Sequence, residues 1–146
     1  MIPTFQSSGL LPPGIHPATW HEIEQRFGYN LHRKWLLQAL MRALRELRAA
    51  GCSIAYLDGS FVTAKELPED YDACWSITNV DPSHLDQVLL KFDDGRRAMK
   101  AKYFGDLFPA EITEDGSGKP FLDFFQIDKS SGDSKGIISI DLRGLP

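Results

Sequence analysis

The chain is poor in cysteine and in long apolar runs, and each shortage excludes a class of protein. Among its 146 residues only Cys52 and Cys74 are cysteines, too few for a disulfide framework and not in a zinc-binding spacing. No apolar run approaches the roughly 20 residues that span a bilayer. The N-terminus also lacks the basic and apolar regions of a signal peptide. We therefore expect a cytoplasmic protein with no membrane segment.

Basic charge is also in short supply. The chain has 16 Lys and Arg residues against 20 Asp and Glu, a formal net charge of −4. This balance excludes a protein whose whole surface coats nucleic acid, although a local basic patch is compatible with it. The four histidines show no HxxxH or HExxH spacing, so the sequence does not predict a zinc site.

Length and patterning predict one α+β domain over residues 1–146, a small mixed β-sheet flanked by helices. Residues 1–17 are rich in proline and should form an extended segment that packs on the domain. Capping residues and apolar periodicity predict helices, whereas short apolar runs predict strands. The expected helices cover 20–27, 31–50, 82–92 and 121–125, and the expected strands cover 52–57, 70–75, 105–112 and 137–140.

The most informative pattern is Gly59-Ser60, nine further residues, and then Asp70-Tyr71-Asp72, set between two apolar runs. Side chains two apart on a strand share a face, so both carboxylates point the same way. At about 4 Å such a pair repels by roughly 4 kcal/mol at an effective dielectric of 20. A cation such as Mg²⁺ relieves that repulsion, and Gly59 and Ser60 can approach and bind phosphate oxygens. The alternative is a simple turn followed by aspartates that cap a strand.

This segment resembles the nucleotidyltransferase (DNA polymerase β-like) superfamily, in particular its minimal nucleotidyltransferase branch. More narrowly, the chain resembles a small bacterial and phage family of unknown function. The narrower likeness covers most of the chain. It rests on Asn30, Arg33 and Leu36, the segment 57–63, the pattern Pro68-x-Asp70-x-Asp72, and the tail motifs in 124–126 and 135–138.

The superfamily resemblance implies a phosphate-binding pair and a metal-binding pair. By position, Gly59 and Ser60 would bind the phosphates of a nucleoside triphosphate, and Asp70 and Asp72 would be the first two metal ligands. Superfamily members use two Mg²⁺ ions held by three carboxylates. Lys65, in the loop between the motif halves, would reach a phosphate or simply be solvated.

The third carboxylate has three candidates. Glu111 comes first because it lies in the expected third strand. Asp123 comes second, in a phenylalanine-rich setting typical of a short helix, and Asp106 comes third. The basic segment 96–102 would hold triphosphate or an RNA end, or else form a solvated helix face.

The resemblance implies an enzyme that moves a nucleoside monophosphate from an NTP, with ATP the first choice, to a hydroxyl of a partner protein or a tRNA. Small members of the superfamily often belong to toxin–antitoxin or phage-defence systems, as homo- or hetero-oligomers. The alternative is a non-catalytic module of the same fold, acting by contact with a partner protein. A third alternative is an accessory protein that contacts nucleic acid through residues 96–102.

Overall fold

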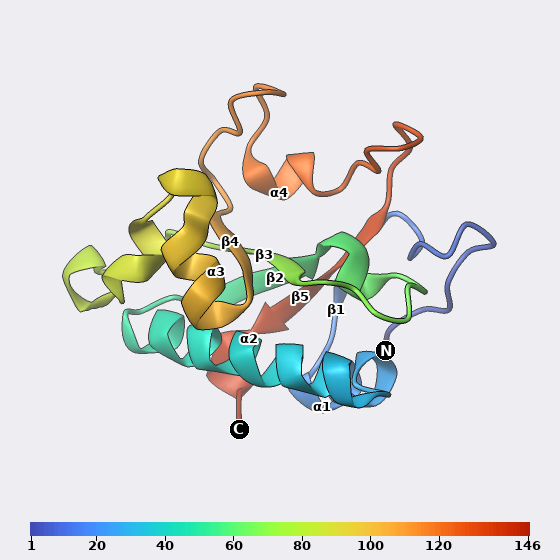
Figure 1. Cartoon of the computed structure of the whole chain (residues 1–146), viewed down its shortest axis with the longest axis horizontal. Helices are drawn as coiled ribbons and strands as arrows, with labels where there is room; N and C mark the ends of the chain where they lie inside the picture. Colours follow the sequence, from blue (N-terminus) through green and yellow to red (C-terminus); the bar gives the residue numbers. More distant parts are fainter.

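A five-stranded mixed sheet forms the centre of the computed structural model, which describes all 146 residues (Figure 1). The strand order is β1-β5-β2-β3-β4. β2 runs antiparallel to β3 and β5, whereas β1–β5 and β3–β4 are parallel pairs. The strands are β1 (Gly14–Pro17), β2 (Ile54–Asp58), β3 (Tyr71–Trp75), β4 (Gly105–Pro109) and β5 (Gly136–Asp141). The predicted α+β class is confirmed.

Four helices accompany the sheet, and two of them begin at the capping residues that the sequence predicts. Thr19 forms a capping box with Glu22, and the Asn30 side chain accepts a hydrogen bond from the backbone of Arg33. No helix is both long and apolar enough to cross a membrane. The helices are α1 (Trp20–Phe27), α2 (Leu31–Ala49), α3 (Arg97–Tyr103) and α4 (Phe121–Phe124).

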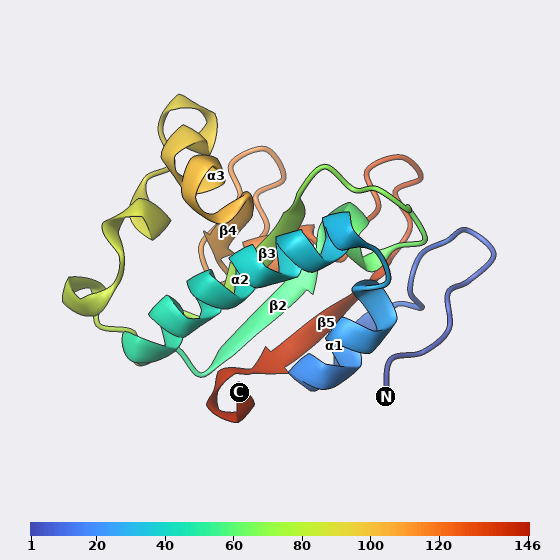
Figure 2. The same cartoon turned by 60° about the horizontal axis from the view of Figure 1, so that its bottom comes forward.

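The two faces of the sheet are covered unequally. Alternation along β2 turns Leu57 toward the main apolar core beneath α1 and α2 (Figure 2), and it turns Asp58 to the opposite face. On that opposite face a small cluster of Cys74, Ala110 and Phe125 packs beneath the short helix α4 (Figure 1). The polar side chains of the strands therefore lie on the face that only α4 and its neighbouring loops cover.

The expected helix over 82–92 is wrong. The segment instead forms two short 3₁₀ turns, Pro82–His84 and Gln87–Leu90, separated by extended backbone at Leu85. The side chains of Asp81 and Asp86 each accept a hydrogen bond from a backbone N–H two residues on. These local bonds compete with continuous helical pairing and restart the turn.

A buried arginine on α2 holds the loop between β2 and β3. The Arg33 side chain is fully buried, and its guanidinium lies 4.9 Å from the ring of Tyr29 and 4.8 Å from the ring of Phe61. Burial lowers its pKa. Its N–H groups donate to the backbone carbonyls of Phe27, Phe61, Thr63, Lys65 and Glu66. These bonds use the full donor capacity of the guanidinium and fix the loop that follows Gly59 and Ser60.

Candidate functional site

Three aspartates stand at one register on three neighbouring strands. Asp58 of β2 pairs with Asp72 of β3, and Asp72 pairs with Asp106 of β4. Directly paired residues share a face, with Cβ atoms roughly 4.5–5.5 Å apart in antiparallel pairs. Asp70 lies two residues before Asp72 and precedes β3. We call Asp58, Asp70, Asp72 and Asp106 the aspartate row.

Burial and mutual repulsion raise the pKa of three members of the row. Burial, followed by the charges of Asp70 and Asp106, raises the pKa of Asp72 to about 6. Burial and then the Asp72 charge raise the pKa of Asp58 well above its usual range. The pKa of Asp70 is also raised, by burial and then by Asp106. The row therefore concentrates negative charge that the protein's own groups only partly neutralise.

Asp58 has the least compensation in the row. Its side chain is fully buried, and the thiol of Cys74 donates a hydrogen bond of 3.4 Å to Oδ2. Its Oδ1 atom has no hydrogen-bond partner. A buried oxygen without a partner costs about 1–3 kcal/mol, so this position is held by the surrounding sheet. Sequence reasoning missed Asp58, although its place directly before Gly59 in the motif was visible.

Two basic side chains hold Asp106. Arg96 Nε lies 2.9 Å from Oδ1, and Lys100 Nζ lies 3.7 Å from Oδ2. Arg96 is the last residue of a short turn, Asp94–Arg96. The φ values of its three residues are all positive, at 51°, 64° and 62°. Left-handed backbone at a non-glycine residue costs of order 1–3 kcal/mol and persists where the surroundings determine it. The Asp106 ion pair is one such determinant.

Gly59 brings the two halves of the sequence motif into contact. Its φ is +74°, and a Cβ at this position would lie 2.3 Å from Asp72 Oδ2. The backbone can therefore pass the Asp72 carboxylate only at a glycine. Ser60 follows in the 3₁₀ turn Gly59–Val62, and the Thr63 hydroxyl donates a 2.6 Å hydrogen bond to the Ser60 carbonyl. The structure thus brings Gly59, Ser60 and Asp72 together.

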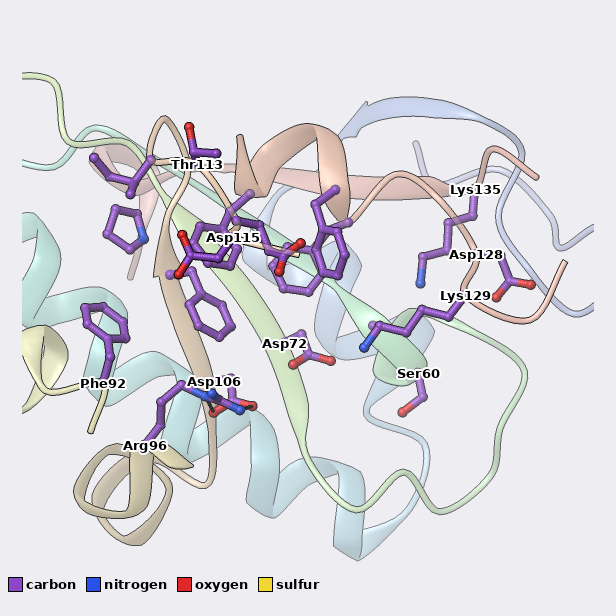
Figure 3. A pocket seen from close by; sticks show the side chains of 18 of the residues that line it. Ser60, Asp72, Phe92, Arg96, Asp106, Thr113, Asp115, Asp128, Lys129 and Lys135 are labelled. Carbon is purple, nitrogen blue, oxygen red and sulfur yellow. Dashed lines mark hydrogen bonds and ion pairs between the residues drawn. The ribbon is translucent and has the colours of Figure 1, made fainter. Parts of the chain in front are cut away.

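These residues line one cavity of about 820 Å³ (Figure 3). Asp72 and Asp106 lie on its wall, Ser60 and the lysines Lys129 and Lys135 lie to one side of Asp72, and Arg96 lies to the other. The two lysines lie in the loop before β5, and the sequence predicted no phosphate-binding role for either, although Lys135 falls in the tail motif 135–138. Both lysine charges act to lower the pKa of Asp72. No local pattern signals their role, because it depends on how the loop returns across the sheet.

The structure does not bring Glu111 to the aspartate row. β4 ends at Pro109, so Glu111 lies beyond the strand and five residues from Asp106. Its carboxylate accepts hydrogen bonds from Ser76 Oγ at 2.6 Å and from the backbone N–H of Ile77 at 2.9 Å. The expectation for Glu111 is therefore corrected: Asp106, the last of the three candidates, lies beside Asp72.

Three other expected residues lie outside the cavity wall. Asp123 is exposed on α4, and Lys65 is exposed in the loop where Arg33 binds its backbone carbonyl. Asp70, although a member of the row, does not line the cavity either. Gly59, Ser60 and Asp72 therefore line the cavity as expected. Asp106, which was the third candidate, and the two lysines Lys129 and Lys135 line it as well.

The donor set suits a hard divalent cation. No three Asp, Glu, His or Cys side chains converge closely enough to form a complete metal centre. Mg²⁺, however, is usually held by one or two carboxylates together with waters and substrate phosphates. Asp72 and Asp106 offer two carboxylates inside the cavity, and burial, followed by the charges of Asp70 and Asp106, raises the pKa of Asp72. Only oxygen ligands are present, which favours Mg²⁺ over softer metals.

The Gly59→Ala variant tests the contact between the motif halves. It should lower the free energy of unfolding by about 1–2 kcal/mol for the left-handed φ and about 1–3 kcal/mol more for overlap with Asp72. Gly95→Ala is the matched control, because Gly95 has φ +64° and nothing within 4 Å of its added Cβ. Urea denaturation measures both variants. Equal losses in the two would show that Gly59 does not approach Asp72.

The Asp72→Asn variant tests the cost of charging Asp72, which burial and then the charges of Asp70 and Asp106 raise. Folded Asp72 holds its proton to about pH 6, whereas an unfolded aspartate loses it near 3.9, so the wild-type free energy of unfolding falls as pH rises between these values. The neutral variant should therefore gain about 3 kcal/mol over wild type at pH 7.5, and most of this gain should disappear near pH 4.

Urea denaturation at the two pH values measures that difference. Asp141→Asn is the control, because Asp141 is exposed and the hydrogen bonds and charge of Arg143 lower its pKa. This control should show no stabilisation at pH 7.5. A gain for Asp72→Asn that is the same at both pH values would contradict the raised pKa of Asp72.

Comparison with known proteins gives one result. No curated protein and no solved structure matches the chain significantly. A family model described as "Family of unknown function (DUF6932)" matches residues 3–141, which is nearly the whole chain. The chain therefore belongs to the family of unknown function DUF6932.

Proposed function

We propose that the protein is a Mg²⁺-dependent nucleotidyltransferase that moves a nucleoside monophosphate from an NTP to a hydroxyl of a protein or a tRNA. The observation that carries this proposal is the contact of the Gly59-Ser60 turn with the aspartate row in one cavity. The turn suits phosphate, and the row suits a divalent cation. Their contact puts both binding functions at one place.

In this proposal one group of cavity residues binds the triphosphate and another binds the cation. The Ser60 hydroxyl and the ammonium groups of Lys129 and Lys135 bind the triphosphate. Asp72 and Asp106, with Asp70 at the edge, hold Mg²⁺, which when bound neutralises charge on the phosphates and lowers the pKa of a bound hydroxyl. A cation at Asp106 would compete with Arg96 and Lys100, which already pair with that carboxylate.

In the proposed reaction the acceptor oxygen bonds to the α-phosphorus, and the bond from this phosphorus to the oxygen leading to the β-phosphate breaks. The proton of the acceptor hydroxyl passes to solvent, and pyrophosphate leaves with both electrons of the broken bond. Ser60, Lys129 and Lys135 then hold the leaving group. Positioning and charge stabilisation are the main contributions that the chain makes.

The cellular setting follows from the resemblance and from the buried free thiols. Cys52 and Cys74 are both buried and unpaired, as suits a cytoplasmic protein. ATP is the preferred donor in this proposal. A toxin–antitoxin or phage-defence system, with the protein in a homo- or hetero-oligomer, is the proposed context and rests on the resemblance alone.

One observation favours a second candidate function, a non-catalytic module of the same fold. Arg96 and Lys100 already pair with Asp106, so the row is partly neutralised without a metal ion. In that case the acidic cavity would serve contact with a partner protein. The two candidates differ in whether nucleotide is transferred.

Incubation with each labelled NTP, Mg²⁺, and either tRNA or a co-purifying protein tests the proposal. Label should appear on one acceptor, and Asp106→Asn should reduce its rate at least about a hundredfold because a metal ligand is lost. Glu111→Gln is the matched control and should stay within about threefold of wild type, since Glu111 bonds only to Ser76 and Ile77.

Removal of Mg²⁺ with a chelator should abolish the labelling in the wild-type protein. Absence of transfer to any acceptor, with partner binding weakened in Asp106→Asn, would support the non-catalytic module, because Asp106 lies in the acidic cavity. Loss of transfer in Glu111→Gln but not in Asp106→Asn would show that the third carboxylate is misassigned.

A further inference from the structure

Phenylalanine side chains gather at one end of the cavity. The rings of Phe108 and Phe121 are stacked at 4.4 Å and 8°, and Phe92 lies nearly parallel to Phe108 at 6.0 Å and 11°. Phe124 and Phe125 contact Phe121 from the same side of the sheet. We call Phe92, Phe108 and Phe121 the aromatic shelf. All three line the cavity that holds Asp72 and Asp106.

The shelf comes from three separate parts of the chain. Phe108 lies on β4 two residues after Asp106, so its side chain leaves the same face of the sheet as that carboxylate. Phe121 begins α4, and Phe92 lies before the turn that carries Arg96. The register that aligns the aspartate row therefore also places a ring beside it.

Phe92 is partly exposed, and it does not belong to either apolar cluster. The residue is 39% exposed, although it lies at the edge of a cavity containing several charges. It is also outside the main core and outside the small cluster beneath α4. An aromatic ring left open beside a charged cavity is suited to stacking against a planar ligand.

Phe92 and the groups suited to phosphate lie on opposite sides of Asp72, although Arg96 also lies 5.2 Å from the centre of the Phe108 ring. Figure 3 places Ser60, Lys129 and Lys135 on one side of Asp72, and Phe92 beyond Asp106 on the other. The cavity volume of about 820 Å³ lies within the range of sites that take small organic ligands. A ligand with an anionic end and a planar aromatic end would match both sides.

We propose that the aromatic shelf is a subsite for the nucleobase, and that it binds the base by stacking. This inference rests on the proposed function, because it names what occupies the end of the site opposite the phosphates. The phenyl rings offer no hydrogen-bonding atoms, so the shelf ranks bases by stacking area and not by their polar edges. The site should therefore prefer purine nucleotides to pyrimidine nucleotides.

Calorimetric titration of the full chain in Mg²⁺ with ATP, UTP and inorganic tripolyphosphate tests this subsite. ATP should bind more tightly than UTP, and UTP more tightly than tripolyphosphate. Phe92→Leu keeps an apolar side chain but removes the ring, so it should weaken ATP about tenfold and leave tripolyphosphate unchanged. Phe92→Tyr keeps the ring and should restore ATP affinity.

Phe5→Leu is the matched control, because Phe5 packs against Phe27 and Arg26 outside the cavity. It should leave all three affinities unchanged. Equal affinities for ATP and tripolyphosphate, or unchanged ATP affinity in Phe92→Leu, would overturn the subsite. Binding of none of the three ligands would overturn both the subsite and the proposed function.

The transfer assay shows whether the subsite or the proposed enzymatic function has failed. ATP affinity that depends on Phe92, together with no transfer to any acceptor, would keep the subsite and contradict the enzyme. Transfer that continues while Phe92→Leu binds ATP normally would contradict the subsite and keep the enzyme.

Discussion

Repulsion among the carboxylates of the aspartate row is the interaction on which the site depends. Asp72 lies between Asp58 and Asp106 across three neighbouring strands, and the Asp70 carboxylate lies beside them. The protein answers this repulsion from several directions: Arg96 and Lys100 pair with Asp106, Cys74 donates to Asp58, and two lysines approach from the loop before β5. The compensation is incomplete, and this is the reason why we propose that the row binds a cation.

The unequal faces of the sheet explain why such a row can exist. The face beneath α1 and α2 is closed by apolar side chains, where unpaired carboxylates would cost several kcal/mol each. The face beneath α4 is closed only in part, and Asp72 and Asp106 line the cavity that lies there. The guanidinium of Arg33, which lies on the covered face, donates hydrogen bonds to the backbone carbonyls of Phe61 and Thr63. These bonds hold the loop that contains Gly59 and Ser60.

The spacing of residues along the chain predicted the part of the site that two neighbouring strands and the loop between them form. Gly59, Ser60 and Asp72 meet because β2 and β3 are antiparallel neighbours joined by one loop. Asp106 joins them through the parallel pairing of β3 with β4, and the register of that pairing depends on the irregular connection between them. The expected third strand ran to residue 112, but β4 ends at Pro109, so Glu111 falls outside the row.

The central claim is that the aspartate row, completed by Asp106, binds a divalent cation together with a nucleoside triphosphate. Anomalous diffraction from crystals grown with Mn²⁺ and a non-hydrolysable ATP analogue tests it most directly. The account predicts a Mn²⁺ peak coordinated by Asp72 and Asp106, with Arg96 moved away from Asp106. A peak at Glu111, or no peak with Arg96 still bound to Asp106, would contradict it.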